Sequence, residues 1–223
     1  MSLRHRFKIA KLNSEVDEID LDALTNVNFE SAPGNGITVG GDYPWASLPG
    51  GIIVGDRQIA NPPTFKTHQG VMAAYEFDVL DEVYSEFHLP QDYVPGSDLY
   101  IRAHWSHILG SDPGGAVTWG FWATHAKGYD QDSFSPPLPV ETSQAPSPAQ
   151  YRHQIAETVL TSPSSIVPNT LPSGDLEPGS LILVKTYLKS NSMTGAKPFC
   201  HFVGIHYQTT GVGTKEKAPN FYT

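Results

Sequence analysis

Short segments in which apolar and polar residues alternate constrain this chain more than any other feature. The clearest runs from Leu99 to His107, where leucine, isoleucine, alanine and tryptophan alternate with tyrosine, arginine, histidine and serine. A period of two is that of a β-strand with one buried face. The same pattern is found in four further segments, Val71–Val79, Val117–Ala123, Leu181–Leu188 and Phe199–Tyr207. The sequence therefore predicts an all-β fold.

The spacing of the segments favours a two-sheet sandwich. We expect about eight strands between residues 51 and 209, and their irregular connections favour a jelly-roll-like β-sandwich over an up-and-down barrel. The strands at 98–108 and 116–126 are predicted to form a β-hairpin. Residues 127–149 are rich in proline and serine, so they are interpreted as a long loop.

The chain is expected to have three regions: an N-terminal arm with a turn-rich lead-in over residues 1–50, the sandwich domain over 51–210, and a C-terminal tail over 211–223. Residues 1–30 are basic and then acidic, with sparse hydrophobic residues. Such a segment is expected to order only against a partner. The candidate contact residues of the arm are Arg4, Arg6, Phe7, Leu12, Val16 and Ile19.

Composition excludes several function classes. The net charge of −9, from 23 acidic and 14 basic residues, argues against a nucleic-acid-binding surface, which needs clustered lysine and arginine. The lone Cys200 is unable to form an internal disulfide and is interpreted as a small buried hydrophobic residue. No window approaches the roughly 20 apolar residues of a membrane helix. The protein is expected to be soluble and used without export.

Catalytic and metal-binding patterns are also disfavoured. His104 and His107 would point to opposite faces of a strand, and no glutamate follows at the spacing of cupin-type metal sites. We therefore expect the strand histidines to be hydrogen-bonded at a sheet face or subunit interface, with no metal or other cofactor. Glu76 and Asp78 share a strand face that is interpreted as solvated. No nucleophile elbow or phosphate-binding loop is present, so no enzymatic activity is expected.

Aromatic and apolar strands point instead to contacts. Trp119 and Trp122 have opposite parity, so one should face outward if the other is buried. Three roles are open for the aromatic residues: packing in the core, contact at an oligomer interface, or stacking on a sugar ring. The segments Leu181–Leu188 and Phe199–Tyr207 are apolar on both faces, and no helix is available to cover them. Either the long loops or another copy of the subunit should cover the outer face, and the second possibility predicts a homo-oligomer. The candidate interface residues are Trp105, Trp119, Trp122, Tyr187, Phe202 and His206.

Three segments resemble structural proteins of tailed bacteriophages. They are Phe87–Ser106, which contains the run LPQDYVPGSDLYIRAHWS, Val117–Phe121, and the ending His206–Tyr222. The resemblance covers roughly residues 43–222. It implies a virion component built on a jelly-roll sandwich, commonly a trimeric cement or decoration protein on the capsid and in some cases a tail or fibre component. It implies no catalytic residues.

The first hypothesis is a homotrimeric capsid cement protein whose arm clamps the major capsid protein. Such a protein would be made in the host cytoplasm and lie on the virion surface, with neither nucleic acid nor membrane as a partner. The alternative is a phage tail or fibre module that contacts host glycan through Trp122 or Tyr129. A third hypothesis, a metal-dependent cupin-like enzyme, is disfavoured by the histidine spacing.

Overall fold

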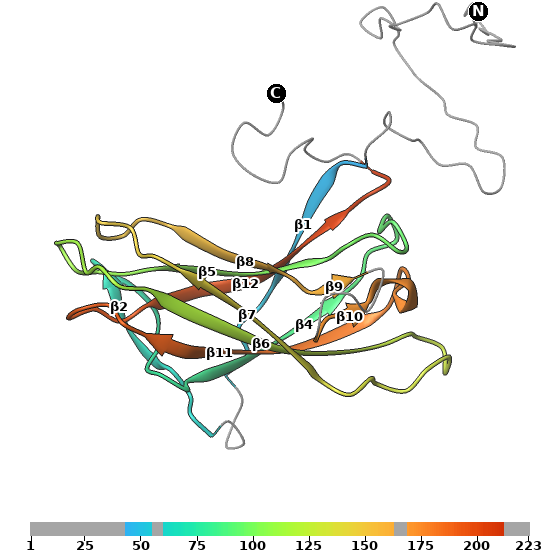
Figure 1. The fold of residues 1–223 in the computed structure, drawn as a ribbon, viewed down its shortest axis with the longest axis horizontal. Coiled ribbons are helices and arrows are strands. Elements are labelled where there is room, and N and C mark those ends of the chain that lie inside the picture. The colour runs from blue at the N-terminus through green and yellow to red at the C-terminus, as the bar shows by residue number, and fades with distance from the viewer. Residues whose placement is uncertain (1–42, 55–59, 163–168, 212–223) are drawn as a thin grey trace, which may run out of the picture. The chain divides into compact units, whose positions relative to one another are not determined.

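Two antiparallel sheets face one another in the part of the chain that the computed structural model describes, residues 43–54, 60–162 and 169–211 (Figure 1). Sheet one has the order β2 (Thr64–Gln69), β3 (Met72–Glu76), β12 (Phe199–Gln208), β5 (Tyr100–Ser106), β8 (Gln154–Val159), with β1 (Trp45–Gly50) also paired to β12. Sheet two has the order β4 (Glu82–His88), β11 (Leu181–Asn191), β6 (Val117–Ala126), β7 (Leu138–Gln144). A short parallel pair, β9 (Thr161–Ser162) and β10 (Leu171–Pro172), and one 3-10 turn, η1 (Ser173–Asp175), precede β11.

The pairing of the strands is that of a jelly roll. Eight strands, β3 to β8, β11 and β12, pair from the two ends of this series inwards. The pairs are β3 with β12, β4 with β11, β5 with β8, and β6 with β7. A ribbon of four antiparallel pairs, rolled so that successive pairs fall in opposite sheets, gives this architecture. The predicted jelly-roll-like sandwich is confirmed.

The core lies between the sheets and contains the apolar residues that the alternation placed on one face. Leu99, Ile101, Ala103 and Trp105 are all fully buried. Trp119 of sheet two packs edge-on against Phe77, with ring centroids 5.2 Å apart. Full burial of a large apolar side chain contributes roughly 1.5–3 kcal/mol, so this layer is the main source of stability.

The predicted hairpin of residues 98–108 and 116–126 is wrong. β5 belongs to sheet one and β6 to sheet two, and the two strands do not pair. In this jelly roll the connection from β5 to β6 crosses from one sheet to the other. Alternation shows that each segment is a strand, but it carries no information about its partner.

Two strands lie where the sequence predicts loop or lead-in. β7 lies within the predicted loop 127–149. It is the edge strand of sheet two and pairs only with β6, so it tolerates Pro139 and a largely polar sequence. β1 precedes the predicted start of the sandwich at residue 51 and pairs with β12 along its whole length.

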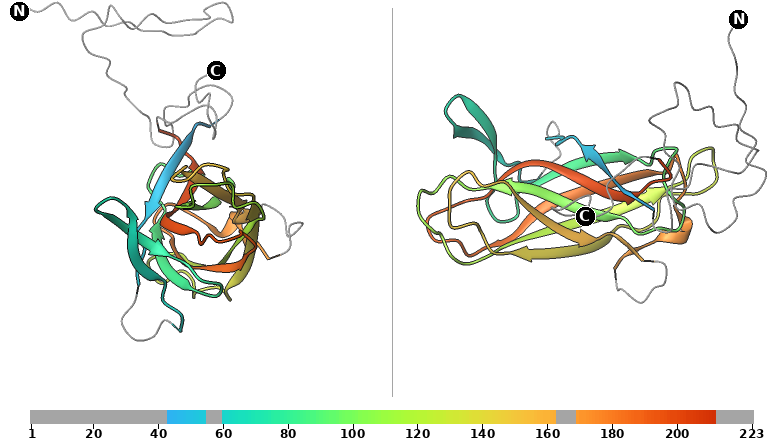
Figure 2. Two further views of the ribbon diagram at one scale, coloured as in Figure 1. Left: turned by 90° about the vertical axis from the view of Figure 1, so that its left-hand side faces the viewer. Right: turned by 90° about the horizontal axis from the view of Figure 1, so that it is seen from above.

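The segment Val71–Val79 has less buried surface than its alternation predicts. Only residues 72–76 form β3, and Val71, at the turn between β2 and β3, is 98% exposed. Val79 also lies outside the strand and is exposed, whereas Phe77 is fully buried. The β2–β3 hairpin projects from the sandwich, as Figure 2 shows, so the outer half of its apolar pattern has nothing to pack against.

A bulge in β12 reverses the expected parity of the last strand. The register with β5 shifts between Cys200 and Phe202. As a result Cys200 faces the core together with Val203, while Phe199 and Phe202 lie on the outer face of sheet one. The two-sided apolar character of β12 thus comes partly from this extra residue.

Candidate functional site

The six candidate interface residues fall in three different places. Trp105 and Trp119 are in the core, Phe202 and His206 are on the outer face of sheet one, and Trp122 and Tyr187 are on the outer face of sheet two. For the first pair the interface prediction is wrong, because β5 and β6 belong to opposite sheets and both rings point into the shared core. The arm candidates Arg4, Arg6, Phe7, Leu12, Val16 and Ile19 lie outside the described residues.

The outer face of sheet two carries an aromatic surface centred on Trp122, which we call the Trp122 face. Its central row crosses all four strands as Tyr84, Lys185, Trp122 and Pro139. Trp122 is 39% exposed while Trp119, three residues earlier on the same strand, is fully buried. The predicted opposite orientation of these two tryptophans is confirmed.

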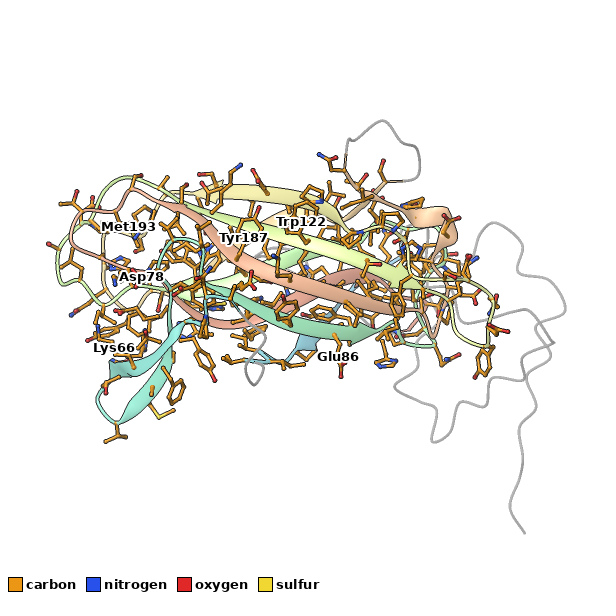
Figure 3. All side chains as sticks on the ribbon, turned by 90° about the horizontal axis from the view of Figure 1, so that it is seen from below. Lys66, Asp78, Glu86, Trp122, Tyr187 and Met193 are labelled. Carbon is orange, nitrogen blue, oxygen red and sulfur yellow. The ribbon has the colours of Figure 1, made fainter. Side chains whose placement is uncertain are left out.

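Gly120 allows Tyr187 to lie across the sheet. The two residues are cross-strand neighbours, and a Cβ atom at Gly120 would lie 2.2 Å from Cζ of Tyr187. Any larger residue at position 120 would therefore push the ring away from the strand. Figure 3 looks onto this face and shows Trp122 and Tyr187 on the two central strands, β6 and β11.

Two hollows flank Trp122. The larger, about 490 Å³, is lined by Tyr84, Trp122, Thr124, Pro137, Leu183, Val184 and Lys185. The smaller, about 230 Å³, is lined by Asn61, Leu80, Glu82, Trp122, Lys185 and Tyr187. Both hollows are lined by Trp122 and Lys185, so they adjoin one another, and together we call them the trough. Tyr129, the other aromatic residue predicted to contact glycan, is almost fully exposed on the connection after β6 and lines neither hollow.

Paired charges border the trough. Lys185 forms an ion pair with Glu82 at 3.1 Å, and the Tyr84 hydroxyl donates to Oε1 of Glu82 at 3.4 Å. On the other side Tyr187 donates to Oε1 of Glu141 at 3.3 Å, and Lys189 forms an ion pair with the same carboxylate. Burial raises the pKa of Tyr187, and the Glu141 charge raises it further. The phenol is therefore a neutral donor at pH 7.

The outer face of sheet one has a different chemistry, dominated by histidines; we call it the histidine face. The Ser106 hydroxyl lies between two rings, 2.8 Å from Nε2 of His68 and 2.8 Å from Nε2 of His201. His104 Nδ1 lies 2.8 Å from Nε2 of His153, and its ring stacks on Phe202 with centroids 3.8 Å apart. The prediction of hydrogen-bonded histidines at a sheet face is confirmed.

The imidazoles of His68, His104 and His201 are neutral at pH 7. Burial is the main cause that lowers the pKa of His104 to about 3 and of His201 to about 4, and burial also lowers the pKa of His68. Arg102, on the same face, adds to the lowering at His104, and its own guanidinium donates to Oγ of Ser47 at 2.9 Å. His104 is only 4% exposed although it points away from the core.

The remaining polar candidates lie in the core or form ion pairs. Within the described ranges no group of three or more histidine, cysteine, aspartate or glutamate residues is arranged to hold a metal ion. Burial raises the pKa of Cys200 to about 12, as expected for a thiol inside the core. Glu76 and Asp78 form ion pairs with Lys66 at 3.0 Å and with Lys197 at 2.6 Å. The expectation that they share a solvated strand face is wrong, because β3 ends at Glu76 and the Glu76 side chain is only 11% exposed, whereas Asp78 lies beyond the strand and is solvated.

Comparisons with known proteins give only distant likenesses. No family model and no curated protein matches the chain. Among solved structures, dimeric latent PorU from Porphyromonas gingivalis is 12% identical over 81% of this chain, with a TM-score of 0.31; the match spans only 14% of PorU. A CBM 22 xylan-binding domain is 13% identical over 81% of this chain and 99% of the domain, with a TM-score of 0.30. The stem and receptor-binding domain of spike protein P1 from bacteriophage PM2 is 8% identical over 66% of each chain, with a TM-score of 0.25.

Likenesses at this level carry no argument about function, so the two faces are interpreted from their own chemistry. Among the residues with assigned structure, no helix is long and apolar enough to cross a membrane.

Proposed function

We propose that this chain is a non-enzymatic structural protein of a tailed-phage virion, of the capsid cement or decoration type. In this proposal three copies associate through the histidine face, and the trimer binds the major capsid protein at the virion surface. The observation that carries the proposal is the low charge and the aromatic character of the histidine face.

The histidine face is suited to burial against another copy. Trp45 and Tyr100 meet edge-on with ring centroids 5.5 Å apart, and Phe202 and Ile155 add apolar surface beside them. The polar side chains on this face include neutral imidazoles, so covering the face removes few charged groups from water. Arg102 is the exception, and Glu157 beside it stabilises its charge.

The resemblance to phage structural proteins supports the number of copies and the capsid as target. A trimer at a junction of capsomers would bind several shell subunits at once, and multivalency raises its avidity without any new contact. The arm of residues 1–30 would supply the attachment to each capsid subunit. The role is mechanical: it holds the shell together against the pressure of packaged DNA.

A matched pair of charge substitutions tests the interface. Ile155 and Leu183 are 37% and 36% exposed and lie on the outer faces of sheet one and sheet two respectively. We expect the wild type to scatter light as a particle of about three times the 24.3 kDa chain mass, Ile155→Glu to dissociate it, and Leu183→Glu to leave it intact. A monomeric wild type, or a trimer lost only in Leu183→Glu, would contradict the proposed interface.

Deletion of residues 1–30 tests the attachment. The truncated protein should still scatter light as a particle of three chains and keep its melting temperature, and its binding to capsids stripped of the protein should fall sharply. Immunogold labelling of intact virions should decorate the head; labelling confined to the tail would overturn the cement role. Undiminished decoration by the truncated trimer would show that the arm is not the anchor.

A further inference from the structure

We infer that the trough on the Trp122 face is a binding site for a neutral oligosaccharide. The inference goes beyond capsid attachment and uses the opposite sheet from the proposed trimer interface. A trimer formed through sheet one would leave three copies of this trough uncovered.

The size and continuity of the trough suit a chain of small rings. Its larger hollow, about 490 Å³, falls in the range of roughly 300–1,000 Å³ typical of ligand pockets. The second hollow continues on the far side of Trp122, so that the indole stands between two adjoining subsites. A ligand of several linked rings would contact both sides of this one side chain.

The aromatic rings are placed to stack on flat apolar surfaces. Tyr84 and Trp122 project from alternate strands, which puts them about 10 Å apart across the sheet. Tyr187, seated over Gly120, adds a third ring that lines the smaller hollow. One face of a pyranose ring carries only C–H groups, and such a face packs on an aromatic ring while the hydroxyl groups point to the sides.

The rim of the trough offers both donors and acceptors to those hydroxyl groups. Glu82 and Glu141 accept hydrogen bonds, and Lys185 donates them. Each is already engaged in an ion pair or hydrogen bond and is thereby oriented, yet each retains unused donor or acceptor capacity. Sugar hydroxyls both donate and accept, which matches this mixed border.

The charge of the face favours a neutral sugar. Its outward side chains include three carboxylates, Glu82, Glu86 and Glu141, against two ammonium groups, Lys185 and Lys189. A sulfated or phosphorylated polymer would meet net repulsion. A proline-rich peptide also seeks grooves lined by aromatic residues, but it brings few hydroxyl groups to the charged rim.

The test titrates the full-length protein with defined probes and follows tryptophan fluorescence and heat. The probes are neutral hexasaccharides of β-1,4-glucose, α-1,4-glucose, β-1,4-mannose and β-1,4-N-acetylglucosamine, with a heparin hexasaccharide and decaproline as comparators. We expect saturable binding of at least one neutral sugar and a blue shift of emission, because Trp122 is the most exposed of the four tryptophans. Binding of heparin or decaproline alone, or of no neutral sugar at millimolar concentration, would overturn the inference.

Variants locate the site. Trp122→Ala should weaken the sugar by at least about tenfold, as truncation of a central aromatic anchor does. Leu183→Glu, which places a carboxylate in the larger hollow, should weaken it similarly and is a second test if Trp122→Ala misfolds. Phe65→Ala, at an exposed aromatic on the distant β2–β3 hairpin, should leave the affinity unchanged. Full affinity in both trough variants would place any binding elsewhere and overturn the assignment.

Discussion

The two outer faces of the sandwich come from the same alternating pattern but have opposite properties. On sheet one the outward residues Arg102, His104 and Ser106 are almost completely buried. On sheet two the outward residues Tyr84 and Trp122 are each 39% exposed and flank a hollow. One face is closed by its own side chains, and the other is open.

The difference lies in how polar groups are satisfied. The histidine face pairs imidazole rings with one another, as at His104 and His153, so its atoms pack closely and exclude water. The Trp122 face pairs full charges, as at Glu82 and Lys185, and these remain hydrated at the rim. Neutral hydrogen-bonded groups tolerate burial, whereas ion pairs keep a surface open. The first face is therefore suited to a permanent contact and the second to a reversible one.

Acidification should give the largest contrast between the faces. The folded pKa values of His104, about 3, and His201, about 4, lie below the ordinary value of 6.5. The contribution of these two histidines to the free energy of unfolding is fully present above pH 6.5. Below that pH the unfolded chain binds protons that the folded chain does not bind, so the contribution is lost. The free energy of unfolding should therefore fall by several kcal/mol, on the order of 3–6, between pH 7 and 4. Urea unfolding at a series of pH values measures this.

A double variant assigns the effect to the histidine face. His104→Gln with His201→Gln removes the two titrating rings, so the protein should be less stable at pH 7 but much less sensitive to acid. If the variant keeps the steep pH dependence of the wild type, other groups are responsible.

Truncating one aromatic residue on each face should give the second largest difference between the faces, measured as the loss of unfolding free energy. Phe202 is half-buried and stacked on His104, so Phe202→Ala should cost about 1–3 kcal/mol of unfolding free energy. Trp122 is 39% exposed and lies on an open face, so Trp122→Ala should cost less unfolding free energy than Phe202→Ala. Chemical denaturation of both variants at one pH compares them directly. Equal losses would mean that the Trp122 face is as tightly packed as the histidine face.

A pair of glycines gives a finer comparison. Gly120→Ala would place Cβ against the Tyr187 ring and should cost about 1–3 kcal/mol through overpacking. At Gly204, on the histidine face, an added Cβ atom would lie 3.4 Å from the nearest atom, which belongs to Phe202. Gly204→Ala should therefore leave the free energy of unfolding nearly unchanged. Melting temperatures of the two variants test the contrast. A larger loss at position 204 would reverse it.

The smallest effect should come from an ion pair at the rim. Lys185→Met removes the partner of Glu82 and should change stability by no more than about 1 kcal/mol, because a partly exposed pair is weak. Added salt should reduce even this difference between wild type and variant. A loss that is large and unaffected by salt would indicate a pair shielded from water.

The sequence was sufficient to predict the strands that form the core and their inward residues. The alternation from Leu99 to Trp105 reports burial directly, because a half-buried strand has to alternate. It is silent about pairing, which is why β5 and β6 were predicted to form a hairpin. It is also blind to an edge strand such as β7, whose proline and polar residues are tolerated with a partner on only one side.

The candidate sites were predictable in part for the same reason. Trp119 and Trp122 are three residues apart on one strand, so they point to opposite faces. Burial of Trp119 in the core therefore implies that Trp122 faces outward. The bulge at Cys200 and Phe202 shifts parity within β12, and no local sequence signal marks it. The meeting of His68, Ser106 and His201 arises from three strands far apart in the chain, so only the sheet order brings it about.

The pairing of β1 with β12 determines how the described part of the chain responds to force. Trp45 lies opposite Gln208, and the amide of Thr209 donates to the carbonyl of Pro44 at 2.9 Å, so the first and last described segments end side by side. In Figure 2 the two strands extend together from the sandwich. Tension on the two ends would load these hydrogen bonds one after another, as in a zipper. β1 would peel away at low force, and the jelly roll behind it would remain folded.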